Sequence, residues 1–212
     1  AQLVPYILYA ILAIPLPLLV VQVLAIDLAI DVIPSLALSR EPPEAGIMQE
    51  PPRSIKERLF TRGVFLRSLY ISLIISGGAM FACVNTWMAG GWQFGMSLAP
   101  NDPVYIKGVT MTFAGIVLGQ VGNVIACRTS KQSIFKTSLS KNKWIIVGIA
   151  AQLSILSFLV YVPIMQGLFG TTGLGIMDWG VLFLITLAVI WAEEIRKFCV
   201  RRFSKTTEDL TK

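Results

Sequence analysis

Long apolar runs constrain this chain more than any other feature of its 212 residues. Because a helix rises about 1.5 Å per residue, about 20 apolar residues cross a hydrocarbon core of about 30 Å. Six candidate spans follow, at residues 1–14, 18–38, 64–88, 106–126, 144–165 and 179–198. Hydrophobic residues make up 55% of the chain and charged residues only 14%, which excludes an ordinary soluble domain. The sequence therefore predicts an all-α, polytopic membrane helix bundle of six transmembrane helices.

The first two spans are separated by the segment IPLPL. Pro15 and Pro17 permit only a tight, non-helical reversal there, so we expect a helical hairpin. The first span is too short to cross a membrane alone, and it opens without an initiator Met. We therefore interpret the chain as cut from a longer polypeptide.

The basic residues predict orientation, because loops rich in Lys and Arg stay in the cytoplasm. Of the 18 Lys and Arg residues, only Lys107 does not follow the second, fourth or sixth span. This pattern indicates topology rather than nucleic-acid binding. We expect a transport domain over residues 1–200, with a loop at 39–63, a tail at 201–212 and both termini in the cytoplasm. Tryptophans near the predicted span ends are typical of anchors at the lipid interface; they are Trp87, Trp92, Trp144, Trp179 and Trp191.

Several kinds of chemistry are excluded by composition. The chain has no His, so it carries no imidazole base, His-containing zinc site or Ser-His-Asp triad. Its three cysteines, Cys83, Cys127 and Cys199, are far apart and form no CxxC pair. We expect them to be packing residues rather than metal or redox ligands.

Asp27 and Asp31 lie near the middle of the second span, whereas the other ten of the 12 acidic residues lie in loops or at span ends. Placing one carboxylate at mid-bilayer costs at least about 2.5 kcal/mol. Spaced i,i+4, the two side chains project from one helix face. The alternative to a functional site is that both are protonated structural residues that hold the bundle together.

Pro34 adds a backbone oxygen to this region. A helical proline has no N–H to donate to residue i−4, so the carbonyl of Ile30 is expected to be free. Two carboxylates and a loosened carbonyl form the hard-oxygen environment that Na⁺, K⁺, Ca²⁺ or Mg²⁺ favours. The sequence thus predicts a cation site in outline.

Neutral polar residues inside other spans are candidates to complete this shell, because their side-chain oxygens are acceptors. They are Gln2 in the first span, Gln120 and Asn123 in the fourth, and Gln152 and Ser154 in the fifth. For Gln120, binding a ligand and holding two helices together are equally good readings; for Gln152 and Ser154 the structural role is favoured. The glycines Gly77, Gly78, Gly115, Gly119 and Gly122 indicate close helix packing rather than a phosphate loop.

The hairpin segment PLPLLVVQVLAIDLAIDVIPSLALSREPPEAGIMQEPPR, residues 15–53, resembles the C-terminal transmembrane half of a type II P-type cation-transporting ATPase. CRTSKQSIF at 127–135 and EEIRKF at 193–198 look closer to sodium/potassium pumps than to calcium pumps. The resemblance covers the whole chain. It implies the fifth to tenth helices of a ten-helix transport domain in the plasma membrane.

By position, the resemblance implies a set of cation ligands: Asp27, Asp31 and Ile30 on the sixth helix, Gln2 on the fifth, and Gln120 and Asn123 on the eighth. Gln2 stands where the family often carries a glutamate, which removes one negative charge. Ile30 replaces a threonine and leaves only its backbone carbonyl to bind. Gln152 stands where sodium/potassium pumps carry an acidic residue. These departures leave the cation open among Na⁺, K⁺ and Ca²⁺, with the smaller charge favouring a monovalent ion.

The resemblance also implies partners. Helices one to four and the actuator, phosphorylation and nucleotide domains of the same pump would supply ATP and Mg²⁺ binding, since this chain has neither a P-loop nor a DKTGT sequence. We therefore expect no catalytic or cofactor-binding residue here and no activity from the fragment alone. The EPPE and EPPR segments at 41–44 and 50–53 would contact the phosphorylation domain, or serve as a plain surface linker. The short loop between the third and fourth spans argues against an accessory β-type subunit.

Two other classes remain open from sequence. In a passive channel or secondary transporter, the same aspartates would line a pore or carry protons. A stand-alone protein descended from a pump would instead act as a structural or regulatory membrane partner.

Overall fold

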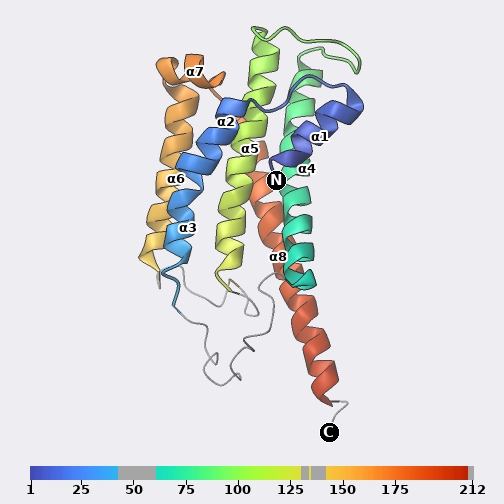
Figure 1. The fold of residues 1–212 in the computed structure, drawn as a ribbon, viewed down its shortest axis with the longest axis vertical. Helices are drawn as coiled ribbons and strands as arrows, with labels where there is room; N and C mark the ends of the chain where they lie inside the picture. Colours follow the sequence, from blue (N-terminus) through green and yellow to red (C-terminus); the bar gives the residue numbers. More distant parts are fainter. Residues whose placement is uncertain (43–60, 130–133, 135–141, 210–212) are drawn as a thin grey trace.

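The computed structural model describes residues 1–42, 61–129, 134 and 142–209, with side chains up to residue 200. The described residues form helices and connecting segments and no strand (Figure 1). The elements are α1 (Leu3–Leu12), α2 (Val20–Ala25), the π-helical turn η1 (Ile26–Ile30), α3 (Val32–Leu38), α4 (Arg62–Ala89), α5 (Pro103–Cys127), α6 (Lys143–Tyr161), α7 (Pro163–Phe169) and α8 (Ile176–Asp209).

Within the described ranges, five helical stretches are long and apolar enough to cross a membrane: Val20–Leu38, Arg62–Ala89, Pro103–Cys127, Lys143–Tyr161 and Ile176–Val200. The first of them joins α2, η1 and α3. The shorter apolar helix α1 precedes it, and the backbone between residues 13 and 19 is non-helical where the two prolines stand. The predicted class, a polytopic bundle of about six helices, is confirmed.

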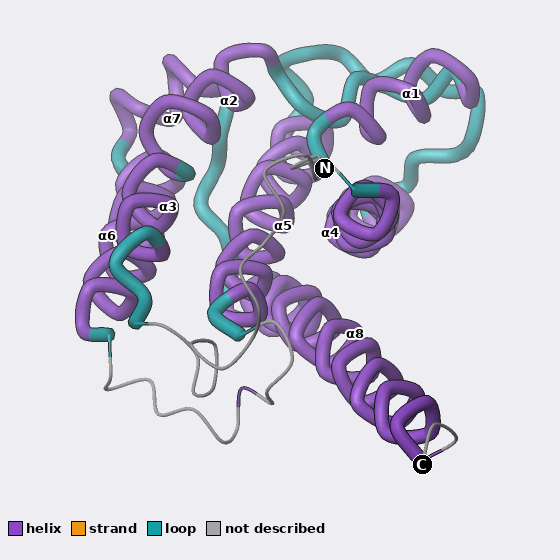
Figure 2. Tube along the Cα trace, turned by 60° about the horizontal axis from the view of Figure 1, so that its bottom comes forward, coloured by secondary structure: helices purple, strands orange, loops and turns teal. Residues whose placement is uncertain are grey.

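Helix α5 is the centre of the bundle. It lies between the pair α3 and α6 on one side and the pair α4 and α8 on the other (Figures 1 and 2). It is buried along most of its length, whereas the other spans expose most of their apolar surface. Exposed apolar side chains are expected where lipid tails are the solvent.

The predicted close packing is found at the glycines of α5 but not at Gly77 on α4, where a Cβ atom would meet nothing within 4 Å. A Cβ atom on Gly119 would lie 2.7 Å from Cγ2 of Ile75 on α4. A Cβ atom on Gly122 would lie 2.8 Å from the backbone oxygen of Thr186 on α8. Small residues at such contacts are typical of helix association in membranes.

Two helix boundaries differ from those expected. The span at 144–165 is divided at Val162, because Pro163 ends α6 and begins α7. Helix α8 continues to Asp209, into the segment expected to be a tail, since no Gly or Pro follows Gly180 to end it.

The predicted role of the tryptophans is wrong for two of them. Trp87 and Trp92 are buried, and the ring of Trp87 stacks on Tyr105 with 6.1 Å between ring centroids. Their indole N–H groups donate to backbone oxygens of Tyr105 and Met96. Both rings thus have packing surface and a hydrogen-bond partner inside the protein. They stabilise this end of the bundle and do not face the lipid.

Candidate functional site

The backbone of the second span departs from an α-helix where the two aspartates lie. Residues Ile26–Ile30 form a π-helical turn, and the amide of Asp31 donates to the carbonyl of Ile26 at 2.9 Å. Pro34, one turn further on, has no N–H to offer Ile30. Single π-turns within α-helices are frequent at functional sites, because they loosen the backbone ladder locally.

Asp27 lies within the π-turn and is hydrogen-bonded to the N-cap residue of helix α1. The side-chain amide of Gln2 donates to Oδ1 of Asp27 at 2.9 Å. The structure therefore brings together two predicted ligands that are 25 positions apart. Among the described residues, the Asp27 side chain is exposed, so one side of this pair is open.

Asp31 follows the π-turn and is bonded to the central helix. The side-chain amide of Gln120 donates to Oδ2 of Asp31 at 2.7 Å. The other amide atom of Gln120, Oε1, is buried and has no hydrogen-bond partner among the described residues. A buried acceptor beside a carboxylate is a group that a cation can satisfy.

The two remaining predicted ligands, Ile30 and Asn123, form no side-chain hydrogen bond with the aspartates among the described residues. Ile30 packs its side chain fully into the core, so only its backbone oxygen is available to a ligand. Asn123 lies one turn from Gln120, and its Oδ1 accepts from Sγ of Cys127 at 3.3 Å. Gln120 and Asn123 line one hollow of 370 Å³ between α4 and α5.

The donor set consists of two carboxylates and neutral oxygens. Among the described residues, no three His, Cys, Asp or Glu side chains gather in a group that could hold a metal ion. The arrangement instead offers hard oxygen ligands with a total charge of two negative units. Such a set suits a transported cation that binds and leaves, rather than a permanently held transition metal.

The other intramembrane candidates, Gln152 and Ser154, form no hydrogen bond with the aspartates among the described residues. Gln152 is buried on α6, and its amide donates to the backbone oxygen of Val117 on α5 at 3.5 Å. Its Oε1 has no partner among the described residues. Ser154 is exposed. The contact of Gln152 with α5 agrees with the structural role favoured for it.

A charged cluster joins α4 and α8, and sequence reasoning missed most of it. Glu193 forms ion pairs with Arg67 at 2.6 Å and Arg196 at 2.7 Å. The spacing of Glu193 and Lys197 suits an i,i+4 ion pair on a helix, but Lys197 instead pairs with Glu194 at 3.5 Å. The adjacent glutamates Glu193 and Glu194 were the sequence feature that indicated this cluster. Which basic side chain pairs with each glutamate depends on how α8 is rotated against its neighbours.

The start of the loop after α3 is anchored to two other spans. Glu41 accepts hydrogen bonds from Nε of Arg128 at 3.0 Å and from the Asn142 side chain at 2.8 Å. Thus Glu41, the first residue of EPPE, holds the ends of α3, α5 and α6 together. The EPPR segment and most of the predicted basic loop lie outside the described residues.

An all-helical bundle of membrane-crossing length, with carboxylates bonded to amides within its spans, defines a multi-pass membrane protein. The family model described as cation transporting ATPase, C-terminus, matches residues 15–199, and the chain belongs to this family. Asp27, Asp31 and Gln120 lie within the matched residues, whereas Gln2 precedes them.

Relatives include pumps for different cations. The chain is 32% identical over 93% of its length to calcium-transporting ATPase 1 of Saccharomyces cerevisiae, covering 19% of that protein. It is 30% identical over 96% of its length to potassium-transporting ATPase alpha chain 2 of Oryctolagus cuniculus, covering 21%. It is 26% identical over 92% to calcium-transporting ATPase type 2C member 2 of Rattus norvegicus, covering 20%. The chain therefore spans about a fifth of the length of these relatives.

Proposed function

We propose that this chain is the cation-binding transmembrane part of an ATP-driven P-type cation pump. The observation that carries the proposal is the convergence of three elements on the π-turn, through the bonds Gln2 to Asp27 and Gln120 to Asp31. A carboxylate inside a span is costly unless it serves a ligand or a partner. Family membership and relatives that transport Ca²⁺ or K⁺ support the same assignment.

The cation would replace the amide protons as the partner of the carboxylates. Rotation of each glutamine amide would turn its oxygen, in place of its NH₂ group, toward the ion. The buried Oε1 of Gln120 has no donor within the described part of the chain, so coordination would satisfy it. The Ile30 carbonyl and Asn123 would complete the shell from the same span and the same helix as Asp31 and Gln120.

The ATP-dependent steps would take place in other domains of the pump. ATP and Mg²⁺ would bind cytoplasmic domains that precede this chain in a pump, and phosphorylation there would move the helices so that the site opens to each side in turn. The hydrogen bonds of Glu41 with Arg128 and Asn142 would transmit that movement to α3, α5 and α6. Both termini would lie in the cytoplasm of a plasma-membrane protein. The β-type subunit would not be required.

The experiment that tests this function measures ATPase activity in membranes that contain the pump polypeptide carrying this chain. Na⁺, K⁺ and Ca²⁺ are titrated separately, beside the double variant Asp27→Asn/Asp31→Asn. Stimulation by one ion that disappears in the double variant is expected, and it identifies the ion. Ion flux without any ion-stimulated ATPase, in a folded preparation, would instead support a channel or secondary transporter.

A further inference from the structure

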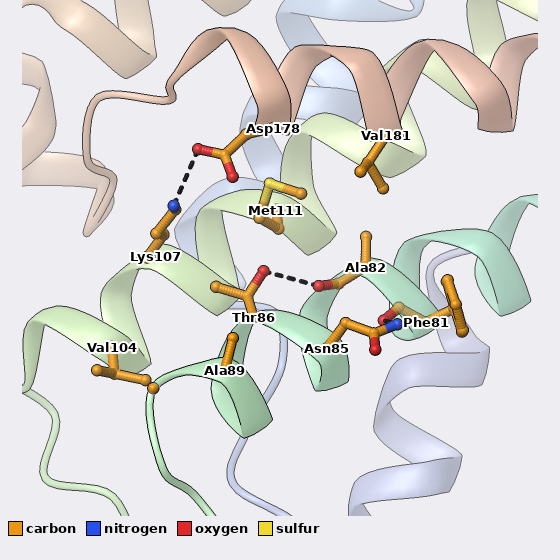
Figure 3. A pocket seen from close by; sticks show the side chains of 11 residues that line it. Phe81, Ala82, Asn85, Thr86, Ala89, Val104, Lys107, Met111, Asp178 and Val181 are labelled. Atoms are coloured by element: carbon orange, nitrogen blue, oxygen red, sulfur yellow. Dashed lines mark hydrogen bonds and ion pairs between the residues drawn. The ribbon is translucent and has the colours of Figure 1, made fainter.

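A groove of 530 Å³ opens between α4, α5 and α8, where α4 ends and the other two helices begin (Figure 3). Its volume lies in the range of about 300–1,000 Å³ that is typical of small-molecule sites. The described residues that line it are Phe81, Ala82, Asn85, Thr86, Ala89, Gly90, Val104, Lys107, Met111, Asp178 and Val181. None of the predicted cation ligands is among them, so this groove is separate from the cation site.

Only two lining residues carry a charge, and they are paired. Nζ of Lys107 lies 3.0 Å from Oδ2 of Asp178, and the same oxygen accepts from the backbone amide of Gly175 at 2.8 Å. Oδ1 of Asp178 has no partner among the described residues, and the ammonium of Lys107 has donors to spare. The rim therefore offers one free anionic acceptor and free cationic donors side by side, with no net charge.

The polar and apolar parts of the groove are separated by depth. Asp178 lies in the first turn of α8 and Lys107 directly after the first turn of α5, near one end of the bundle. Met111 lies one turn deeper on α5 and Val181 one turn deeper on α8, while Phe81 on α4 is 67% exposed. Figure 3 shows the ion pair on one side of the groove and these apolar side chains beyond it. A ligand that fits has a zwitterionic head and an apolar tail.

We propose that this groove binds a phospholipid whose headgroup carries a phosphate and a primary ammonium, as in phosphatidylethanolamine. The phosphate would accept from Lys107, the ammonium would donate to Oδ1 of Asp178, and an acyl chain would lie against Phe81, Met111 and Val181. A choline headgroup has no N–H to donate to Asp178, and an anionic headgroup leaves that carboxylate unmatched. The site requires only that the chain lies in a bilayer, so it does not depend on the cation site.

Native mass spectrometry of the protein released from mild detergent tests this assignment. Phosphatidylethanolamine, phosphatidylcholine and phosphatidylglycerol with identical acyl chains are added at equal concentration. Phosphatidylethanolamine should bind about tenfold more tightly than the other two, as expected for one additional charge-assisted hydrogen bond. Asp178→Asn keeps an acceptor oxygen but removes the charge that strengthens the bond, so it should reduce the preference for phosphatidylethanolamine over phosphatidylcholine. Lys107→Gln should weaken binding of both lipids.

A pair of tryptophan variants separates the groove from the general lipid surface. Val181→Trp fills the groove and should release the bound lipid, whereas Leu184→Trp lies on α8 outside the lining and should not. Circular dichroism verifies that each variant is folded; if Val181→Trp is not, the smaller change Asp178→Asn decides. Equal binding of all three lipids, unchanged by Asp178→Asn, would overturn the proposal. A bound protein mass in place of lipid, lost in Lys107→Gln, would also overturn it.

Discussion

The carboxylate of Asp31 lies inside an apolar span and accepts a hydrogen bond of 2.7 Å from Gln120. The amide thus satisfies one carboxylate oxygen while its own oxygen stays buried and unpartnered among the described residues. Gln120 acts here as a donor, and in the proposed function it would act as an acceptor for the bound cation. One side chain would therefore serve first the carboxylate and then the ion.

Replacing Gln120 tests this dual role. Gln120→Leu keeps similar bulk but removes both the donor and the acceptor, so the apparent affinity for the stimulating cation should fall about tenfold, the effect of losing one charged hydrogen bond. The concentration of cation that gives half-maximal ATPase activity measures this shift. Gln152→Leu is the matched control, because the hydrogen bond of that amide within the described residues goes to a backbone oxygen of α5 and not to an aspartate. Equal shifts in the two variants would contradict a specific role for Gln120.

The sequence was enough to predict both aspartates as candidate site residues. A charge inside an apolar run is costly whatever the rotation of the helix about its axis. Their partners could not be assigned in the same way. Gln2, Gln120 and Gln152 are all amides within spans, and sequence does not give the rotation of each helix about its axis. The structure joins the first two to the aspartates and the third to Val117.

At the scale of elements, the π-turn and the glycines of α5 do different work. The turn Ile26–Ile30 loosens the second span at the proposed cation site, whereas the glycines tighten the contact of α5 with α4 and α8. Proline and glycine positions predicted the break at IPLPL and this close packing. The π-turn itself was not predicted, because no residue type specifies an i→i−5 bond. The division at Val162 follows from Pro163, which an apolar run alone conceals.

The packing role of Gly122 predicts a contrast with Gly77. Gly122→Ala would place a methyl group 2.8 Å from the Thr186 carbonyl, and overpacking of this kind typically costs about 1–3 kcal/mol. A Cβ atom on Gly77 meets nothing within 4 Å, so Gly77→Ala should be neutral or slightly stabilising. Thermal unfolding in detergent, followed by circular dichroism, measures both. Equal melting temperatures for the two variants would show that α5 and α8 are not packed as the structure has them.

At the scale of the whole molecule, ion pairs lie toward both ends of the bundle. Lys107 pairs with Asp178 at one end, whereas Arg128 pairs with Glu41 and Arg196 with Glu193 toward the other. Composition and span length could predict the membrane fold, since lipid imposes helices on any apolar chain of this length. The interactions of Glu41 and Glu193 that join separate spans could not be predicted from the sequence, because each connects segments that are far apart in it.

Orientation can be tested with single cysteines in a variant whose three native cysteines are replaced by alanine. Ser97→Cys, in the connection between α4 and α5, should react with a membrane-impermeant thiol reagent added to intact cells. Lys143→Cys, at the start of α6, should react only after the membrane is opened, because basic ends face the cytoplasm. The reverse labelling pattern would contradict the proposed orientation.

The most direct test of the central claim is equilibrium binding of radioactive sodium, rubidium or calcium to membranes containing the pump polypeptide. One of the ions should bind saturably, and Asp31→Asn should weaken that binding by about tenfold or more, since an ion loses one charged ligand. Asp102→Asn makes the same chemical change at the start of α5, where an asparagine caps the helix equally well, and should leave binding unchanged. Wild-type affinity in Asp31→Asn would contradict the claim that this carboxylate binds the transported cation.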